Sequence, residues 1–182
     1  MATAVSKAGN TPPRHPSLRR WSAWGMLASF IGICIAHAAI YEWRSRHLLL
    51  INSSNSLPNW AFVIERGVSP KQGDYVFFDP PSNVLVKRHF GVHPQMFGKI
   101  VYGMPGDIVA HRGATVTING DPVATMKPRS RFGETLTPGV TGAIPAGCYF
   151  AGTPHPDGFD SRYAQIGFVC ARQIIGTGEP VL

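Results

Sequence analysis

The chain carries a serine and a lysine whose surroundings suit covalent acyl transfer. Ser56 lies in SSNSLP, a polar run that ends at a proline. A serine hydroxyl is a poor nucleophile until a base takes its proton, and a lysine can be that base where burial keeps its amine neutral. Lys99 lies among apolar residues in FGKIVYGMPGD, which favours such burial. Ser56 alone is equally a turn residue. Three other lysines compete with Lys99 on position alone: Lys71, Lys87 and Lys127.

Other catalytic chemistries lack their motifs. The seven histidines are scattered, and the sequence contains no GxSxG, CxxC or HExxH. Four histidines follow the apolar segment at a distance, and none stands in a recognisable nucleophile-and-base motif: His89, His93, His111 and His155. We therefore expect neither a metal ion nor another cofactor.

One long apolar segment lies near the start of the chain. Trp21 to Tyr41 contains no Asp, Glu, Lys or Arg. As a helix at ~1.5 Å per residue it would span about 30 Å, the thickness of a bilayer core. We predict a disordered basic arm over residues 1–20, a transmembrane helix over 21–43 and a soluble catalytic domain over 44–182.

Two other interpretations of this segment remain. A buried core helix is disfavoured because basic residues flank only one of its ends. A cleaved signal peptide is the closer competitor, since Ala36-His37-Ala38 resembles a small-x-small cleavage site, but the apolar run is long for a signal peptide.

The formal net charge of +7 is unevenly distributed. The first 20 residues contain four basic residues and no acid, whereas the remainder holds 13 basic and 10 acidic residues. A basic arm beside an apolar segment places the N-terminus inside and residues 44–182 outside. Because most of the excess charge lies outside the predicted domain, we expect membrane lipid rather than nucleic acid as a partner.

The chain after residue 43 is predicted to be mainly β. Sixteen prolines and 20 glycines indicate short elements joined by turns, and no segment shows a convincing helical period. The expected strands lie in AFVIERG, QGDYVFFDPP, NVLVKRHFG, GKIVYGMPGDIVAHRG with a break at 103–106, the hairpin ATVTINGDPVAT, GCYFAGT and IGFVCARQIIG.

The chain has three cysteines. Cys34 lies within the apolar segment, where it is a small apolar residue. Cys148 and Cys170 lie in the part expected to be exported, where a disulfide can persist. They either form a disulfide or remain two separate buried thiols.

Three short motifs follow the apolar segment in order. They are Ser56-Leu57-Pro58, the K-x-x-x-G-x-P-G-D spacing from Lys99 to Asp107, and Asp160-Ser161-Arg162. Together with the apolar segment they resemble the type I signal peptidase superfamily, the Ser/Lys proteases. The short first motif most resembles the TraF-type peptidases of conjugative transfer, and the likeness covers most of residues 50–177. A signal-peptidase-like β-rich catalytic domain behind one transmembrane helix is the implied fold.

The resemblance implies a role for each motif. Ser56 would attack the scissile carbonyl, while neutral Lys99 would take its proton and later return it to the leaving amine. The backbone N–H of Ser56 and the hydroxyl of Ser54 would bind the oxyanion. Asp160 and Arg162 would support the site.

The chain departs from the pattern of general signal peptidases at several positions. Ile100 follows the lysine where those enzymes usually have Arg, and Gly158 stands where they have a Ser that helps to orient the lysine. Trp60 stands where the TraF branch often has Gly. Trp60 and Phe62 could line the substrate channel or touch the membrane surface, but we expect both to be buried in a strand. Asp107 either pairs with Arg162 or caps a turn.

The resemblance implies a membrane-anchored serine endopeptidase that cuts exported precursors after small residues. The likeness of the first motif to the TraF branch implies maturation of a conjugative pilin precursor, with or without cyclisation. The protein would lie in a bacterial inner membrane, with its catalytic domain in the periplasm. One alternative is a general signal peptidase that acts on many secretory proteins. Another is a non-enzymatic, membrane-anchored assembly component of a conjugation channel.

Overall fold

The computed structural model describes residues 17–52, 54 and 56–181. The chain divides into two compact units, Met1–Ser45 and Arg46–Leu182, each of which is described by itself. Most of the arm predicted over residues 1–20 lies outside the described residues.

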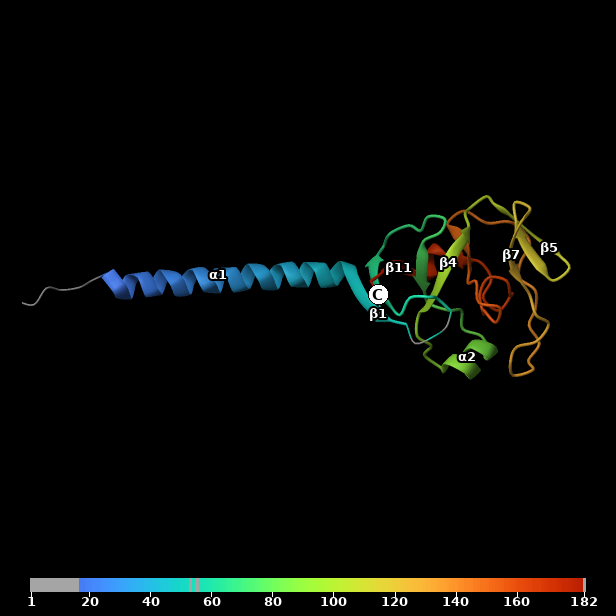
Figure 1. Cartoon of the computed structure of the whole chain (residues 1–182), viewed down its shortest axis with the longest axis horizontal. Helices are drawn as coiled ribbons and strands as arrows, with labels where there is room; N and C mark the ends of the chain where they lie inside the picture. Colours follow the sequence, from blue (N-terminus) through green and yellow to red (C-terminus); the bar gives the residue numbers. More distant parts are fainter. Residues whose placement is uncertain (1–16, 53, 55, 182) are drawn as a thin grey trace, which may run out of the picture. The chain divides into compact units, whose positions relative to one another are not determined.

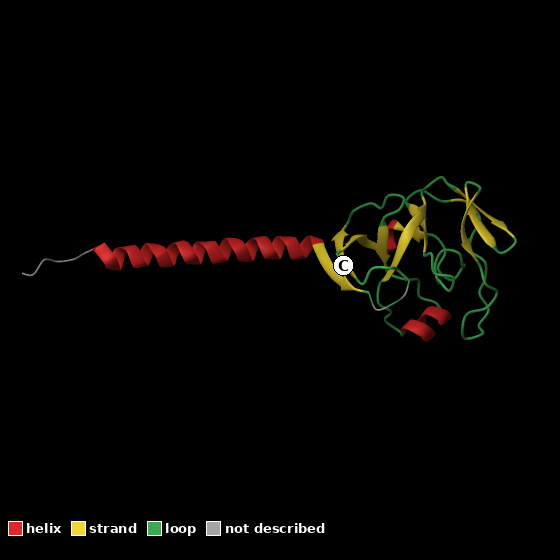
Figure 2. Ribbon diagram, in the orientation of Figure 1, coloured by secondary structure: helices red, strands yellow, loops and turns green. Residues whose placement is uncertain are grey.

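The first unit contains one long helix, α1 (Ser17–Arg46), which is continuous in Figures 1 and 2. Its stretch Ala23–Arg46 is long and apolar enough to cross a membrane, with a mean hydropathy of 1.8 and no part of the span buried in protein. Large apolar side chains such as Trp24, Phe30 and Trp43 are therefore exposed. The helix begins before and ends after the span predicted over 21–43.

The second unit is built from antiparallel β-sheets, which confirms the mainly β prediction. Figure 2 shows its strands, the loops that connect them and short helical segments. One sheet has seven strands in the order β1 (His47–Ile51), β2 (Ala61–Arg66), β11 (Ile174–Pro180), β3 (Tyr75–Phe78), β4 (Phe97–Gly103), β9 (Cys148–Gly152) and β10 (Val169–Cys170). The other has four, in the order β7 (Asp121–Thr125), β6 (Thr115–Ile118), β5 (Ile108–Arg112) and β8 (Gly142–Ala143).

Most of the predicted strands are confirmed. The break at 103–106 separates β4 from β5, and the hairpin of β6 and β7 turns at Asn119 and Gly120, which both have positive φ. The segment IGFVCARQIIG is divided into β10 and β11 by a short 3-10 helix, Ala171–Gln173. Ahead of the Ser56 turn, residues 47–51 form β1, a strand that the sequence did not predict, which pairs with β2 along its whole length.

The prediction of a strand in NVLVKRHFG was wrong, because this segment forms the short helix α2 (Val84–Phe90). The side chain of Asn83 accepts a hydrogen bond from the backbone N–H of Val86 and caps the helix. Gly91 ends it with a φ of 87°, a conformation that suits glycine. Only Val86 of this helix is fully buried, so two turns with one inward residue gave no helical period.

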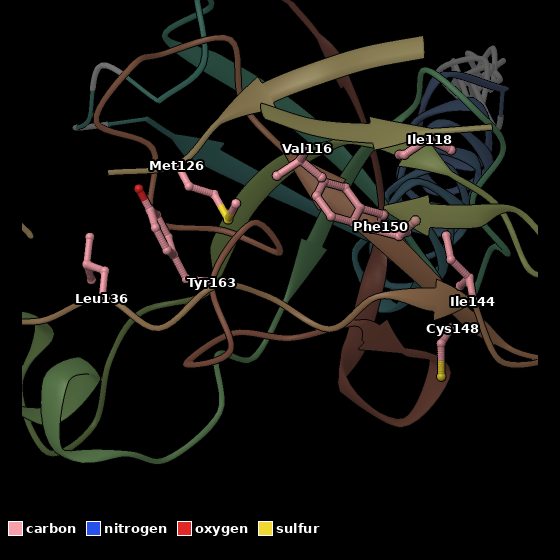
Figure 3. Close-up of a cluster of buried hydrophobic side chains, with 9 residues drawn as sticks. Val116, Ile118, Met126, Leu136, Ile144, Cys148, Phe150 and Tyr163 are labelled. Carbon is pink, nitrogen blue, oxygen red and sulfur yellow. The ribbon is translucent and has the colours of Figure 1, made fainter. Parts of the chain in front are cut away.

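The interior joins the two sheets. Figure 3 shows the largest cluster, in which Val116 and Ile118 of β6 pack with Phe150 of β9 and with Ile144. Gly103, at the end of β4, lies so close to this cluster that a Cβ there would be 2.7 Å from the Cδ1 of Ile144. The two sheets thus pack through one continuous apolar layer.

Burial alternates along β4. Val101 and Gly103 are buried, and Lys99 is the third buried residue at the same two-residue spacing. The strand therefore directs the lysine side chain toward the interior of the fold.

A disulfide joins Cys148 to Cys170, which are opposite partners in β9 and β10. The two cysteines are 22 positions apart, and the loop between them carries Asp160 and Arg162. The open alternative is thereby resolved in favour of the disulfide. It holds together the two ends of the loop that contains the third motif.

Replacing both cysteines by alanine should lower the free energy of unfolding by about 3 kcal/mol, because a loop of this length gains conformational freedom in the unfolded chain. Denaturant unfolding of the full chain in detergent micelles would measure the loss. Reducing agent should shift the native protein to the same midpoint and leave the Cys148→Ala/Cys170→Ala variant unchanged. An unfolding midpoint that is the same in both proteins would contradict the expected contribution.

Candidate active site

A groove of about 760 Å³ contains both residues to which the sequence assigned the chemistry. Ser56 and Lys99 line it, together with Ser54. Apolar side chains of Leu57, Phe77 and Met96 form part of its wall. The structure thus brings the first two motifs to one solvent-accessible surface.

Lys99 differs from the other lysines in the described part of the chain. It is 4% exposed, whereas Lys71, Lys87 and Lys127 are exposed. Its ammonium nitrogen lies 5.8 Å from the centre of the Phe97 ring. Burial removes water from its charged form, and the surrounding residues compensate for this loss only in part.

Burial lowers the pKa of Lys99 from 10.5 to about 8. The negative charge of Asp160 acts against this shift, and the positive charge of Arg162 adds to it. A substantial fraction of the amine is therefore neutral near physiological pH, as a general base requires.

Ser56 lies in a turn organised by Asn52, a residue that the sequence analysis missed. The Asn52 side chain accepts hydrogen bonds of 3.0 Å from the backbone N–H and from the hydroxyl of Ser54. Its amide nitrogen donates to the backbone carbonyls of Leu57, at 3.2 Å, and Asn59, at 2.9 Å. One side chain thus binds the turn on both sides of Ser56, which is itself half-buried.

Ser54 lies beside the proposed nucleophile. The backbone N–H of Ser56 points to the Ser54 hydroxyl oxygen at 3.5 Å, a long and weak contact. Ser54 is exposed in the groove. Its assignment to an oxyanion hole stays a prediction.

Asp160 and Arg162 form a buried ion pair through two parallel hydrogen bonds. The Nε–Oδ1 distance is 2.8 Å and the Nη2–Oδ2 distance is 2.9 Å, and the two side chains are 0% and 2% exposed. Burial raises the pKa of the Asp160 carboxyl, and the Arg162 guanidinium opposes that rise. This geometry stabilises both charges inside the protein.

The ion pair is linked to the serine turn through Thr153, another residue that the sequence did not indicate. Asp160 accepts the backbone N–H of Thr153 at 3.0 Å, and Arg162 donates to its carbonyl at 2.6 Å. The Thr153 hydroxyl in turn donates to the carbonyl of Ser56. The third motif therefore positions the first.

Asp107 caps a turn and does not pair with Arg162. Its carboxylate accepts the backbone N–H of Met104 at 2.7 Å and the side-chain amide of Asn119 at 2.8 Å. These bonds lower its pKa. The P-G-D part of the second motif thus fixes the turn that follows the lysine strand.

Gly158 is required by close packing. A Cβ at this position would lie 2.2 Å from the Cγ2 of Thr153 and 2.8 Å from the Oδ2 of Asp160. No side chain fits there without movement of these groups. The absence of a serine at position 158 therefore has a steric cause.

Two remaining expectations differ in outcome. Phe62 is fully buried, as expected for a strand residue, but Trp60 is 55% exposed, so its predicted burial was wrong. It precedes β2, and its backbone carbonyl accepts a hydrogen bond from the backbone N–H of Asn52 at 2.7 Å. Within the described residues, no group of three or more His, Cys, Asp or Glu side chains could hold a metal ion.

A comparison with protein-family models identifies the family of the chain. The family model described as signal peptidase, peptidase S26, matches residues 19–182, and the chain belongs to this family. It is therefore a signal-peptidase-type serine protease with one helix suited to a membrane anchor.

A search of the solved structures found the crystal structure of a signal peptidase I from Enterococcus faecalis V583. It is 27% identical and matches 60% of this chain and 97% of that chain, with a TM-score of 0.38. A search of the curated proteins found no match.

Replacing Asp160 by Asn should destabilise the protein by about 3–5 kcal/mol, because the Arg162 guanidinium would remain buried without a compensating charge. Denaturant unfolding of the full chain would measure this loss. The matched control is Asp107→Asn at the exposed turn, which should cost much less. Equal losses in the two variants would argue against a special role for the buried pair.

Proposed function

We propose that this protein is a membrane-anchored serine endopeptidase with a Ser56/Lys99 dyad that processes exported precursor proteins. The observation that carries the proposal is the buried lysine in the groove that Ser56 lines. A lysine at the surface would be almost fully protonated at neutral pH and a poor base, whereas burial lowers the pKa of Lys99 to about 8.

The proposed reaction has two halves. The Ser56 oxygen attacks the scissile carbonyl and passes its proton to the neutral Lys99 amine. The resulting ammonium gives that proton to the leaving amine, and an acyl-enzyme remains. The Ser56 N–H and the Ser54 hydroxyl bind the oxyanion, for which the Ser54 hydroxyl must turn its proton away from Asn52 and the Ser56 N–H must give up its weak contact with Ser54. Thr153, Asp160 and Arg162 keep the nucleophile turn in place.

The second half determines the product. If water attacks the acyl-enzyme, Lys99 accepts its proton and a free carboxylate is released. If the N-terminal amine of the same precursor attacks, a peptide bond closes a ring. We propose a conjugative pilin precursor as the substrate because the short Ser56-Leu57-Pro58 motif resembles that of TraF-type peptidases. The general signal peptidase remains the second candidate, since it is supported by the family match.

The location follows from α1 and the disulfide. We propose that α1 is retained as an anchor in a bacterial inner membrane, with the basic arm inside and the domain from residue 44 in the periplasm. The Cys148–Cys170 disulfide supports this orientation because such bonds persist in oxidising compartments. A purely structural role in a conjugation channel would leave the burial of Lys99 without a function.

Ser56→Ala and Lys99→Met should each abolish cleavage of a precursor while leaving the domain folded. Lys99→Met should be at least as stable as the native protein, because it removes a buried amine that favours its neutral form. Intact-mass analysis of purified pilin and secretory precursors would measure processing. Removal of a C-terminal peptide with the additional loss of one water would identify cyclisation.

The matched control for these variants is Lys71→Met, which removes an exposed lysine and should retain full activity. Normal processing by either dyad variant would refute the proposed dyad. Equal cleavage of a secretory precursor and a pilin precursor would favour the general signal peptidase.

The rate constant kcat/KM should rise with pH through about 8 and level off above it. Lys99 must be neutral to accept the serine proton, so activity is present above its pKa and lost below it. Two pH units below the pKa about 1% of the amine is neutral, so the rate should be roughly 100-fold below the plateau. Steady-state cleavage of a quenched fluorescent precursor peptide would measure the profile. A flat profile from pH 6 to 9 would contradict the lysine base.

A further inference from the structure

A second, smaller cavity of about 130 Å³ adjoins the catalytic groove. Its walls come from helix α2 and from the segment 127–136. Four residues line both the cavity and the groove: Phe90, Arg131, Asp157 and Phe159. The cavity therefore lies directly beside the groove, next to a polypeptide that would be bound there.

The cavity is largely apolar inside. Leu85 and Phe90 contribute from α2, Leu136 from the opposite segment, and Phe159 and Tyr163 from the loop of the third motif. A liquid water molecule occupies about 30 Å³, so the volume suits one aliphatic side chain rather than an extended peptide. Figure 3 shows Leu136 and Tyr163 among the side chains of the largest apolar cluster, so the cavity borders the core.

The charged lining residues comprise three cations and two carboxylates, Asp157 and Glu134. Lys127, Arg129 and Arg131 all line the cavity. Lys127 is paired with Asp157, and Arg129 donates to the Gly133 carbonyl at 2.8 Å. Arg131 makes no ion pair with another residue in the described part of the chain. Its guanidinium lies 5.9 Å from the centre of the Phe132 ring and acts electrostatically on Asp157, and its N–H groups can still donate to an anion.

Segment 127–136, which forms the cavity wall opposite α2, is held in place by side-chain contacts with α2 and within the segment. Glu134 lies 2.7 Å from the His89 ring nitrogen and accepts hydrogen bonds from Arg88 at 3.2 Å and Ser130 at 2.9 Å. The Phe132 ring stacks on His89 with centroids 4.8 Å apart. These contacts satisfy Glu134 within the wall and keep the cavity formed in the absence of a ligand.

We infer that this cavity is a second substrate-binding site, which takes an aliphatic side chain of the precursor adjacent to a carboxylate and lies apart from the residues at the scissile bond. The inference rests on the proposed protease function and adds a specificity determinant to it. Its occupant is the precursor polypeptide, because the cavity shares its lining with the groove. The aliphatic side chain enters between α2 and Leu136, and the carboxylate faces Arg131. The carboxylate is either that of an acidic side chain or that of the chain terminus.

The test uses quenched fluorescent peptides with alanine at the cut site and the full-length protein in detergent micelles. A Leu-Glu pair is placed at successive positions on either side of the alanine and is compared with Leu-Gln at the same position. At one position Leu-Glu should lower KM roughly five- to tenfold, since a partly exposed charge-assisted hydrogen bond contributes modestly. The value of kcat should not change, and added salt should reduce the preference.

Arg131→Gln should remove the preference for Leu-Glu while leaving Leu-Gln peptides unaffected. Arg131 is exposed, so the variant is expected to fold. Arg112→Gln, at an exposed arginine on β5 that lines neither cavity, is the matched control and should keep the preference. Leu85→Trp should raise KM for Leu-Glu and Leu-Gln alike, relative to Gly-Gln, because it fills the apolar part. Peptides ending in leucine with a free or an amidated terminus separate a terminal carboxylate from a side-chain carboxylate.

Two results would overturn the second site: no position at which a carboxylate is preferred, or a preference that survives Arg131→Gln. Failure of the protease proposal is distinguishable from either. Binding of the same peptides to the Ser56→Ala variant, measured by fluorescence anisotropy, does not depend on cleavage. Retention of the Leu-Glu preference in binding, without any cleavage by the native protein, would refute the protease and keep the site.

Discussion

Two opposite charges buried at the centre of the second unit, those of Asp160 and Arg162, hold the parts of the groove together. Their side chains bind both backbone groups of Thr153, whose hydroxyl then binds the carbonyl of Ser56. The same two charges act on Lys99 with opposite sign. Burial is the largest influence and lowers the lysine pKa, and Arg162 opposes the rise that Asp160 alone would cause. An unpaired carboxylate at this position would instead stabilise the ammonium form, so the pair serves the electrostatics of the groove as well as its geometry.

Lys99 shows how an ordinary strand can accommodate a buried amine, which is unfavourable for the stability of the fold. The two-residue period of β4 directs its side chain inward, between positions that are otherwise apolar. The surrounding sheet supplies the stability that tolerates a buried amine, since Val101 is fully buried and Gly103 packs closely. The turn capped by Asp107 ends this strand at a defined point. The stability of the sheet and the reactivity of the amine thus both depend on the segment from Lys99 to Asp107.

Much of the fold was predictable because it depends on local patterns. Runs of aromatic and β-branched residues between glycines and prolines marked most strands, and Asn119-Gly120 marked the hairpin. Helix α2 was not predictable, since its two turns place a single residue in the core. The motif residues were found by resemblance, and burial then distinguished Lys99 from the other lysines. Thr153 was out of reach because its contact with Ser56 spans 97 positions in the chain, and no local pattern encodes such a contact.

The tight contact between Gly158 and Thr153 has a consequence for how this sequence can change over evolutionary time. The Cγ2 methyl of Thr153 occupies the space that any side chain at position 158 would need. A serine at 158, as in general signal peptidases, is therefore incompatible with the present residue at 153. Thr153→Ser would keep the hydroxyl on the Ser56 carbonyl and free part of that space. A change at position 153 would not be enough by itself, because a Cβ at 158 would still lie 2.8 Å from the Oδ2 of Asp160 and 2.9 Å from the Nη2 of Arg162, so the buried ion pair also constrains this position.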